Sequence, residues 1–170
     1  MIISLTGFMG CGKSSVGKKL SELLCCRFID LDSEIEKRTG CSVAEIFDRY
    51  GETEFRRIEQ SVLIDIIEAS SPEDKIVLAL GGGAVMTPAI AEAVHDASIC
   101  IYLKASVDEL INRLSSETSG RPLLASSDLR SRILELMGKR ASTYEGVSHH
   151  VIDTDGKTLE ETAAKIIELL

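Results

Sequence analysis

Short apolar runs alternate along this chain with longer stretches in which apolar residues recur every three or four positions. Short runs rich in Ile, Val and Leu predict buried β-strands. Because the longer stretches between them predict helices, the pattern indicates an α/β fold around a parallel sheet. The expected strands are Ile2–Leu5, Phe28–Leu31, Ile76–Leu80, Ile99–Leu103 and His150–Ile152.

Helical periodicity marks the longer stretches. The last of them opens with Thr158 and Glu161 in the spacing of a capping box, which is a helix-start signal. One long polar connection, residues 115–127, contains Gly120 and Pro122. Connections of this length are usually a functional lid or a disordered insert, and we expect a lid at about residues 115–127. The expected helices are Lys13–Leu24, Val43–Tyr50, Glu52–Glu68, Pro88–Val94, Ser106–Leu114, Asp128–Tyr144 and Thr158–Leu170.

Composition narrows the possible classes of protein. The chain has 170 residues, of which 44% are hydrophobic, so it can bury one full core but not two. We therefore expect a single domain over residues 1–170, and a monomer. Its 19 basic and 27 acidic residues give a net charge of −8, which argues against nucleic acid and against an acidic membrane as partners.

Cysteine usage and the start of the chain indicate where the protein works. The five cysteines show neither a disulfide framework nor a CxxC metal spacing, which is typical of a reduced cytosolic protein. Met1 leads into the first predicted strand without a basic leader, and no apolar run approaches the roughly 20 residues of a membrane span. We expect a cytoplasmic protein.

The most specific motif lies between the first predicted strand and the first predicted helix. Residues 7–14, Gly-Phe-Met-Gly-Cys-Gly-Lys-Ser, match G-x-x-x-x-G-K-[ST]. In such a loop, backbone N–H groups face phosphates at the positive end of a helix. Lys13 would bridge the β- and γ-phosphates of a nucleoside triphosphate, and Ser14 would offer its hydroxyl to Mg²⁺. A glycine-rich turn that binds nothing is the alternative, and Cys11 is either an oxidation-sensitive thiol or a small tolerated residue.

Two aspartates follow the second predicted strand. Asp30 and Asp32 should project to the same side, at the strand end where parallel sheets bind ligands, while Leu31 packs away. One carboxylate would suit the Mg²⁺ hydration shell and the other an acceptor hydroxyl. The alternative is that Asp32 only caps a helix that begins near Ser33.

Arginines at three places are candidates for binding an anionic acceptor. Arg56 and Arg57 are neighbours on a predicted helix, so only one of them can face the same cleft, and a solvated face is the common alternative. Arg121 lies in the expected lid, where it could neutralise the transferring phosphoryl group, and Arg140 lies on the next helix. Taken singly, these two arginines stay ambiguous.

Three consecutive glycines, Gly81–Gly83, follow the third predicted strand. They permit either a tight turn or close approach of backbone N–H groups to a ligand, and by themselves favour a turn. That strand lacks the terminal aspartate of the usual second nucleotide motif, which supports giving the metal role to Asp30.

Six motifs in this order resemble the shikimate kinase family over essentially the whole chain: GFMGCGKSS, FIDLDSEIE, SVAEIFDRYGETEFRRIE, LALGGGAV, GRPLL and KRASTYE. The resemblance implies a P-loop NTPase fold of the adenylate-kinase type, a three-layer α/β/α arrangement with a five-stranded parallel sheet. It also implies ATP- and Mg²⁺-dependent phosphorylation of the 3-hydroxyl of shikimate, in aromatic amino acid biosynthesis, and a substrate-binding segment at about residues 32–60.

The same resemblance implies roles for the ambiguous residues on the acceptor side. Asp32 would hold the hydroxyls of shikimate and serve as candidate base, and Arg56 and Arg140 would clamp its carboxylate. Glu59 would orient Arg56, and Gly82 would donate its backbone N–H to the same ligand. The full expected acceptor set is Asp32, Arg56, Glu59, Gly81, Gly82, Gly83 and Arg140.

On the nucleotide side, the resemblance keeps the roles of Lys13 and Ser14 and places Asp30 behind the Mg²⁺ site. Arg121 would be the lid arginine, and Arg113 would stack on adenine. The full expected nucleotide set is Gly10, Cys11, Gly12, Lys13, Ser14, Ser15, Arg113 and Arg121, with Lys13, Asp32 and Arg121 as the catalytic residues.

Three other functions are alternatives to this one. A gluconate kinase shares the loop and the lid, and differs in FRR, the triple glycine and Arg140. A nucleoside monophosphate kinase needs a nucleobase pocket, for which the 4% aromatic content offers little. A non-catalytic nucleotide-binding module would lose the acceptor residues, which this chain retains.

Overall fold

Five parallel strands form the centre of the protein, described here from a computed structural model over residues 1–115 and 128–170. The strands pair in the order β2-β3-β1-β4-β5, and every pair is parallel. They are β1 (Ile2–Thr6), β2 (Arg27–Asp30), β3 (Ile76–Ala79), β4 (Ile99–Lys104) and β5 (His150–Asp153). The predicted five-stranded parallel sheet is confirmed, and each strand lies within about one residue of its predicted bounds.

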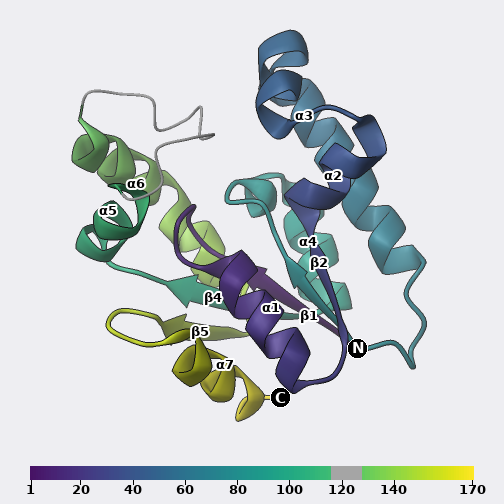
Figure 1. Ribbon diagram of the computed structural model, residues 1–170. Helices are drawn as coiled ribbons and strands as arrows, with labels where there is room; N and C mark the ends of the chain where they lie inside the picture. The colour runs from purple at the N-terminus through teal and green to yellow at the C-terminus, as the bar shows by residue number, and fades with distance from the viewer. Residues whose placement is uncertain (116–127) are drawn as a thin grey trace.

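Helices cover both faces of this sheet (Figure 1). On one face α1 and α7 pack together, and on the other α4 packs against β4 and contacts α3 and α6. The helices of the described residues are α1 (Lys13–Leu23), α2 (Leu31–Thr39), α3 (Val43–Glu68), α4 (Pro88–Ala97), α5 (Val107–Ser115), α6 (Leu129–Val147) and α7 (Leu159–Ile167), with a short 3-10 turn η1 (Ala84–Met86). This is the expected three-layer α/β/α arrangement.

The junction between β2 and α2 differs from the structure predicted for Asp30 and Asp32. The strand ends at Asp30, whose side chain accepts a hydrogen bond from the backbone N–H of Ser33 and caps α2. Leu31 already begins the helix, so Asp32 lies in the first turn of α2 rather than on a strand. The alternation argument for Asp30 and Asp32 was therefore wrong. The competing interpretation, that Asp32 is the cap, was also wrong, because the cap is Asp30.

A kink in α3 separates the two helices that the sequence predicts there. Gly51 has a non-helical backbone, with φ 80° and ψ 172°, inside the span Val43–Glu68. A residue other than glycine rarely adopts this φ. The first piece starts with a capping box in which Ser42 and Glu45 bond each other's backbone N–H. Val43 and Phe47 on this piece line the pocket described below.

One cluster of buried apolar side chains joins the sheet to the helices. Strands β1 and β3 are buried along their whole length, as expected of parallel strands covered on both faces. On α3, Phe55, Val62 and Ile66 are buried, and Ile58 is partly buried against the same core. Because all strands are parallel, the ends of β1, β2 and β3 meet at one edge, and the site lies there.

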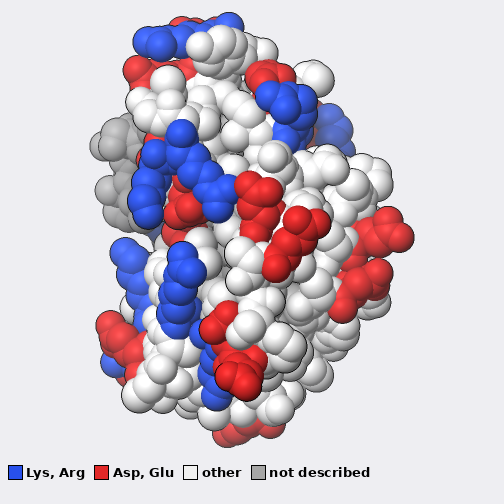
Figure 2. All heavy atoms as spheres, turned by 90° about the vertical axis from the view of Figure 1, so that its right-hand side faces the viewer, with Lys and Arg blue, Asp and Glu red and all other residues white. Residues whose placement is uncertain are grey.

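Charged residues of both signs are interspersed on the face shown in Figure 2. On α2, Arg38 pairs with Glu34 at 2.9 Å and with Asp65 of α3 at 2.7 Å. Exposed pairs of this kind contribute little stability each, on the order of 0–1 kcal/mol. None of the helices in the described ranges is both long and apolar enough to cross a bilayer.

Candidate active site

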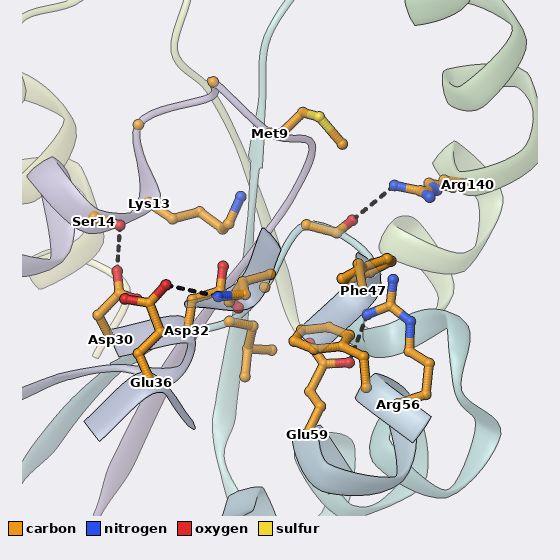
Figure 3. A pocket seen from close by; sticks show the side chains of 18 of the residues that line it. Met9, Lys13, Ser14, Asp30, Asp32, Glu36, Phe47, Arg56, Glu59 and Arg140 are labelled. Carbon is orange, nitrogen blue, oxygen red and sulfur yellow. Dashed lines mark hydrogen bonds and ion pairs between the residues drawn. The ribbon is translucent and has the colours of Figure 1, made fainter. Parts of the chain in front are cut away.

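A pocket of about 400 Å³ opens at the carboxyl ends of β1, β2 and β3. Figure 3 shows that its walls come from the loop before α1, from α2 and α3, from the loop after β3, and from α6. Cys11 and Arg113 lie outside its lining, and Arg121 and the expected lid, except Ser115, fall outside the described residues. The expected site residues that line it are Gly10, Gly12, Lys13, Ser14, Ser15, Asp30, Asp32, Arg56, Glu59, Gly81, Gly82, Gly83 and Arg140.

The loop before α1 has the geometry of a phosphate-binding loop. Gly12 precedes the helix with φ 97°, a left-handed conformation that favours glycine. Lys13 begins α1 and is only 8% exposed, and its ammonium donates to the carbonyl oxygens of Gly7 at 2.9 Å and Phe8 at 3.0 Å. The helix N-terminus and the folded-back lysine together place positive charge at this end of the pocket.

Two oxygen ligands stand side by side next to this lysine. The Ser14 hydroxyl donates to a carboxylate oxygen of Asp30 at 2.5 Å. Both residues line the pocket, and the other oxygen of Asp30 caps α2. Mg²⁺ prefers oxygen ligands and takes few from the protein when phosphates and waters complete its shell. The hydroxyl of Ser14 and the carboxylate of Asp30 supply two such oxygens at the pocket, so the pair fits that pattern.

Asp32 lies on α2 at the base of the pocket, close to the other charged groups. Burial raises the pKa of Asp32, and the negative charge of Asp30 raises it further, while Lys13 and Arg56 act in the opposite direction. The carboxylate also lies against the main chain of Gly81, where an added Cβ would be 3.0 Å from Oδ1 of Asp32.

Arg56 and Glu59 form an ion pair at the side of the pocket. The guanidinium Nη1 of Arg56 donates to Oε2 of Glu59 at 2.6 Å, and Nη2 donates to Glu52 at 3.2 Å. The neighbouring Arg57 has a 70% exposed side chain and pairs with Glu54. Only one of the two consecutive arginines therefore faces the pocket, as their helical spacing requires.

Glu59 is completely buried, which changes its acid–base behaviour. Burial raises the pKa of Glu59 to about 7, although the nearby Arg56 acts to lower it. Its second oxygen, Oε1, has no hydrogen-bond partner within the described ranges. An added Cβ at Gly81 would lie 2.6 Å from this oxygen, so the unpartnered oxygen lies against the loop after β3.

Gly81, Gly82 and Gly83 form a turn, and they also let neighbouring groups approach the backbone closely. Their backbones have no positive φ, and the carbonyls of Gly81 and Gly83 accept bonds from Ala84 and Met86 as the chain enters η1. An added Cβ would meet Glu59 at the first position, the backbone nitrogen of Met9 at 3.2 Å at the second, and Arg56 at 2.3 Å at the third. The turn favoured by the sequence is present, and the space that glycine leaves holds charged side chains.

Arg140 closes the pocket from α6. It is 7% exposed, and its Nη1 donates to the carbonyl of Gly82 at 3.3 Å (Figure 3). The hydroxyl of Tyr144 donates to the same carbonyl. Sequence reasoning missed Tyr144, although it follows Arg140 by four residues and so shares its helix face.

An apolar wall on the first half of α3 was also missed. Val43 and Phe47 line the pocket together with Phe55, and the rings of Phe47 and Phe55 are 4.6 Å apart. The spacing of Val43 and Phe47, four residues apart on a predicted helix, was the available signal.

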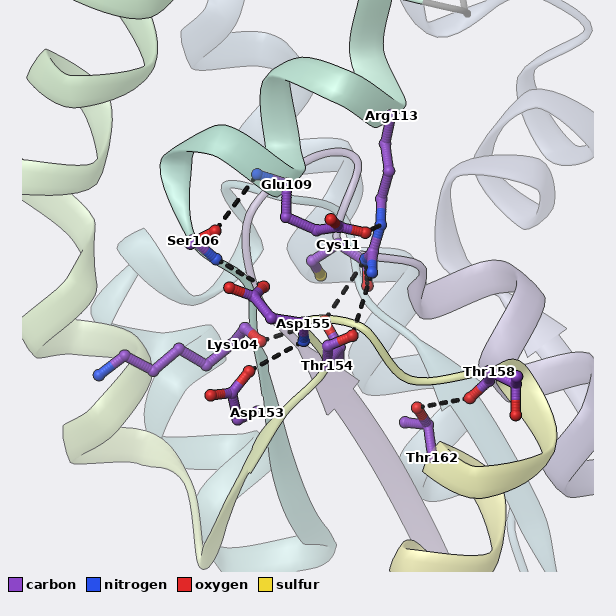
Figure 4. Close-up of polar contacts among 10 residues, drawn as sticks. All are labelled: Cys11, Lys104, Ser106, Glu109, Arg113, Asp153, Thr154, Asp155, Thr158 and Thr162. Carbon is purple, nitrogen blue, oxygen red and sulfur yellow. Dashed lines mark hydrogen bonds and ion pairs between the residues drawn. The ribbon is translucent and has the colours of Figure 1, made fainter.

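Arg113 joins three segments on the far side of the phosphate-binding loop (Figure 4). Its guanidinium donates to Glu109 at 2.8 Å, to the carbonyl of Cys11 at 3.1 Å and to the carbonyl of Thr154 at 3.2 Å. Arg113 therefore lies beside the loop and the segment after β5, outside the pocket. The thiol-bearing Cys11 is fully buried here.

The two ends of the pocket thus suit two different ligands. The helix N-terminus, Lys13 and the Ser14–Asp30 pair suit a polyphosphate with Mg²⁺. Asp32, Arg56 and Arg140 suit a small acceptor that carries an anionic group and a hydroxyl. Phosphoryl transfer asks a protein mainly for positioning and charge neutralisation, and both are present here.

Comparisons with known proteins agree with this geometry. Residues 9–170 match the family model described as shikimate kinase. A shikimate kinase from Caldanaerobacter subterraneus subsp. tengcongensis is 42% identical over 97% of this chain and 93% of its own length. One from Thermus thermophilus is 39% identical over 99% of this chain and 89% of its own. The solved structure of a shikimate kinase from Acinetobacter baumannii in complex with shikimate has a TM-score of 0.92, with 34% identity over 99% of this chain and 91% of that chain.

Proposed function

The chain belongs to the shikimate kinase family, and we propose that it transfers the γ-phosphoryl group of ATP to the 3-hydroxyl of shikimate. The products are shikimate 3-phosphate and ADP, in a step of aromatic amino acid biosynthesis. The observation that supports this most is that Lys13 and Ser14 line the same pocket as Asp32, Arg56 and Arg140. A phosphate donor and a hydroxylated carboxylate can meet there in line.

On the acceptor side, Arg56 and Arg140 bind the carboxylate of shikimate. Both are largely buried, so their charge–charge hydrogen bonds with that group are poorly screened. Glu59 holds Arg56 in place through the 2.6 Å ion pair. Asp32 accepts a hydrogen bond from the hydroxyl that attacks, and its raised pKa suits a group that exchanges a proton with substrate. Gly82 donates its backbone N–H to the same ligand.

On the nucleotide side, the backbone of Gly10 to Ser15 surrounds the phosphates and Lys13 neutralises their charge. Ser14 and Asp30 would hold Mg²⁺, and the bound metal would supply neutralisation of the phosphate charge. Arg113, which lies next to the loop, stacks on the adenine of ATP. Arg121 and the lid at about residues 115–127 remain predictions from the sequence.

The core and the charge of the protein also support a proposal about its organisation and location. One domain over residues 1–170, with a substrate-binding segment at about residues 32–60, suits the continuous core. The acidic net charge of −8 supports a small-molecule kinase without nucleic acid or membrane partners. We propose a cytoplasmic monomer.

A coupled assay of ADP release tests the substrate assignment. With ATP and Mg²⁺, the protein should release ADP in proportion to added shikimate, and hardly at all with gluconate or AMP. Turnover with gluconate or AMP and none with shikimate would overturn the proposal. ATP binding without turnover of any acceptor would favour the non-catalytic module.

A variant of Asp32 tests the acceptor end directly. Asp32→Asn should lower kcat for shikimate by about 100-fold or more, because the hydroxyl loses its proton acceptor, while ATP still binds. Asp48→Asn is the matched control, since Asp48 is exposed on α3 outside the pocket lining. An unchanged rate in Asp32→Asn would remove Asp32 from the chemistry.

A further inference from the structure

The carbonyl oxygen of Gly82 ties α6 to the acceptor end of the pocket. Nη1 of Arg140 donates to this oxygen at 3.3 Å, and the hydroxyl of Tyr144 also donates to it. A carbonyl oxygen has two lone pairs, so these two donors fill its capacity. On the other side, an added Cβ at Gly82 would lie 3.2 Å from the backbone nitrogen of Met9, so Gly82 also touches the phosphate-binding loop.

Tyr144 is held firmly at this position. Its side chain is fully buried, and its ring lies 5.2 Å from the ring of Tyr102, centroid to centroid. Burial raises the pKa of Tyr144, although Arg140 acts to lower it, so the hydroxyl stays protonated and remains a donor. Tyr144 and Arg140 lie one turn apart on α6, so the helix itself fixes their spacing.

We propose that Tyr144 is a positioning residue for the acceptor. Its hydroxyl fixes the Gly82 carbonyl toward α6, and that fixed carbonyl holds one N–H of Arg140 while the remaining guanidinium faces the pocket. The inference rests on the proposed function, because it takes the carboxylate of shikimate as the partner of Arg140. Without the hydroxyl, the carbonyl has one donor fewer and draws Arg140 closer, away from the substrate.

The neighbouring Tyr102 offers a matched control. It is 1% exposed, and its hydroxyl is buried without a hydrogen-bond partner in the part of the chain that the structure describes. Tyr102→Phe and Tyr144→Phe therefore remove the same atom from two rings that touch each other. Only the second change removes a hydrogen bond at the Gly82 carbonyl.

The test compares steady-state kinetics and unfolding free energies of the wild type, both Phe variants, Arg140→Ala, and Arg140→Ala combined with Tyr144→Phe. Tyr144→Phe should raise KM for shikimate about tenfold and leave KM for ATP within about twofold. Tyr102→Phe should leave both constants unchanged. In the Arg140→Ala background, Tyr144→Phe should add little, because Tyr144 acts through Arg140.

Several results would overturn the proposal. These are an unchanged KM for shikimate in Tyr144→Phe, an equal rise in Tyr102→Phe, or a tenfold rise that persists in the Arg140→Ala background. A Tyr144→Phe protein that fails to fold, beside a folded Tyr102→Phe protein, would also overturn it, because the hydroxyl would then serve the fold alone. A wild type without turnover of shikimate would instead refute the proposed function.

Discussion

Glycine-rich segments flank the pocket on two sides, and they differ in why glycine is needed. In the phosphate-binding loop, Gly7, Gly10 and Gly12 all have positive φ, between 84° and 141°. After β3, none of Gly81–Gly83 has a positive φ, but a side chain at any of them would meet neighbouring atoms. The first segment uses the conformational freedom of glycine, and the second uses its small size.

The two segments need glycine for different reasons because they lie next to different ligands in the proposed function. A phosphate is bound by backbone N–H groups, so the loop must turn its main chain inward. In the proposed function the acceptor is bound by side chains from α2, α3 and α6, so the loop after β3 must leave them space. At Gly81 that space holds the carboxylates of Asp32 and Glu59, and at Gly83 it holds the guanidinium of Arg56.

Gly7→Ala should have the largest effect, because position 7 needs both the conformational freedom and the small size of glycine. Its φ is 141°, and an added Cβ would lie 2.6 Å from the backbone oxygen of Leu103 and 2.9 Å from the sulfur of Cys11. We expect a loss of about 4 kcal/mol of unfolding free energy, measured by urea denaturation. Gly156→Ala isolates the conformational part, because Gly156 has φ 66° and no atom within 4 Å. It should lose about 1 kcal/mol, and equal losses in both variants would contradict the steric account.

Glu59→Gln tests the buried charge that the second segment accommodates. The pKa of Glu59 is raised to about 7 by burial, so the folded protein holds the proton of Glu59 more tightly than the unfolded chain does. The stabilising contribution of Glu59 is therefore fully present below its unfolded pKa of about 4.5 and is lost as the pH rises through about 7. Relative to Glu59→Gln, the wild type should lose on the order of 3 kcal/mol across this window.

Glu54→Gln on the same helix is the control for this pH dependence. Arg57 holds the pKa of Glu54 below its usual range, so its contribution has the opposite sign and disappears as the pH falls. Unfolding measured from pH 4.5 to pH 7.5 should therefore show a falling difference for Glu59→Gln and a nearly flat one for Glu54→Gln, whose contribution declines only below its unfolded pKa of about 4.5. A flat difference for Glu59→Gln would mean that Arg56 fully compensates the buried charge.

Gly83→Ala should separate binding from stability. Its Cβ would lie 2.3 Å from Nη2 of Arg56, which is the end of a flexible side chain and can move at small cost to the fold. We expect KM for shikimate to rise about tenfold while KM for ATP and the unfolding free energy change little. Arg56→Ala should give a similar rise, and the double variant should add little to it. A rise that adds fully to that of Arg56→Ala would mean that Gly83 acts through another group.

The two segments also show what could be predicted from the sequence. The phosphate-binding loop was predictable because its conformation is local: the spacing from Gly7 to Ser14, between a strand and a helix, determines it. Gly81–Gly83 were found as a motif, but their reason was not, because the neighbours Asp32, Glu59 and Arg56 come from other helices. Local patterns do not report such contacts.

The same limit explains the errors at the acceptor end. Asp32 was placed on a strand, because a cap at Asp30 and a helix start at Leu31 are decided by one hydrogen bond to Ser33. Tyr144 was missed because its role depends on a carbonyl 62 residues away in sequence. The sheet, by contrast, was predicted almost completely, since its apolar runs are continuous.

Gly138→Ala should have the smallest effect, and of opposite sign. Gly138 lies inside α6 with an ordinary helical φ and no atom within 4 Å of an added Cβ, so it needs neither property that the two segments use. Alanine reduces the entropy of the unfolded chain and should stabilise the protein by about 0.5–1 kcal/mol, with unchanged KM for shikimate and ATP. Thermal unfolding and the coupled assay measure both. Helix α6 also carries Arg140 and Tyr144. A stabilised protein with a raised KM for shikimate would therefore show that the acceptor site depends on the flexibility of this helix. The size and the φ of glycine would then not account for every glycine near the pocket.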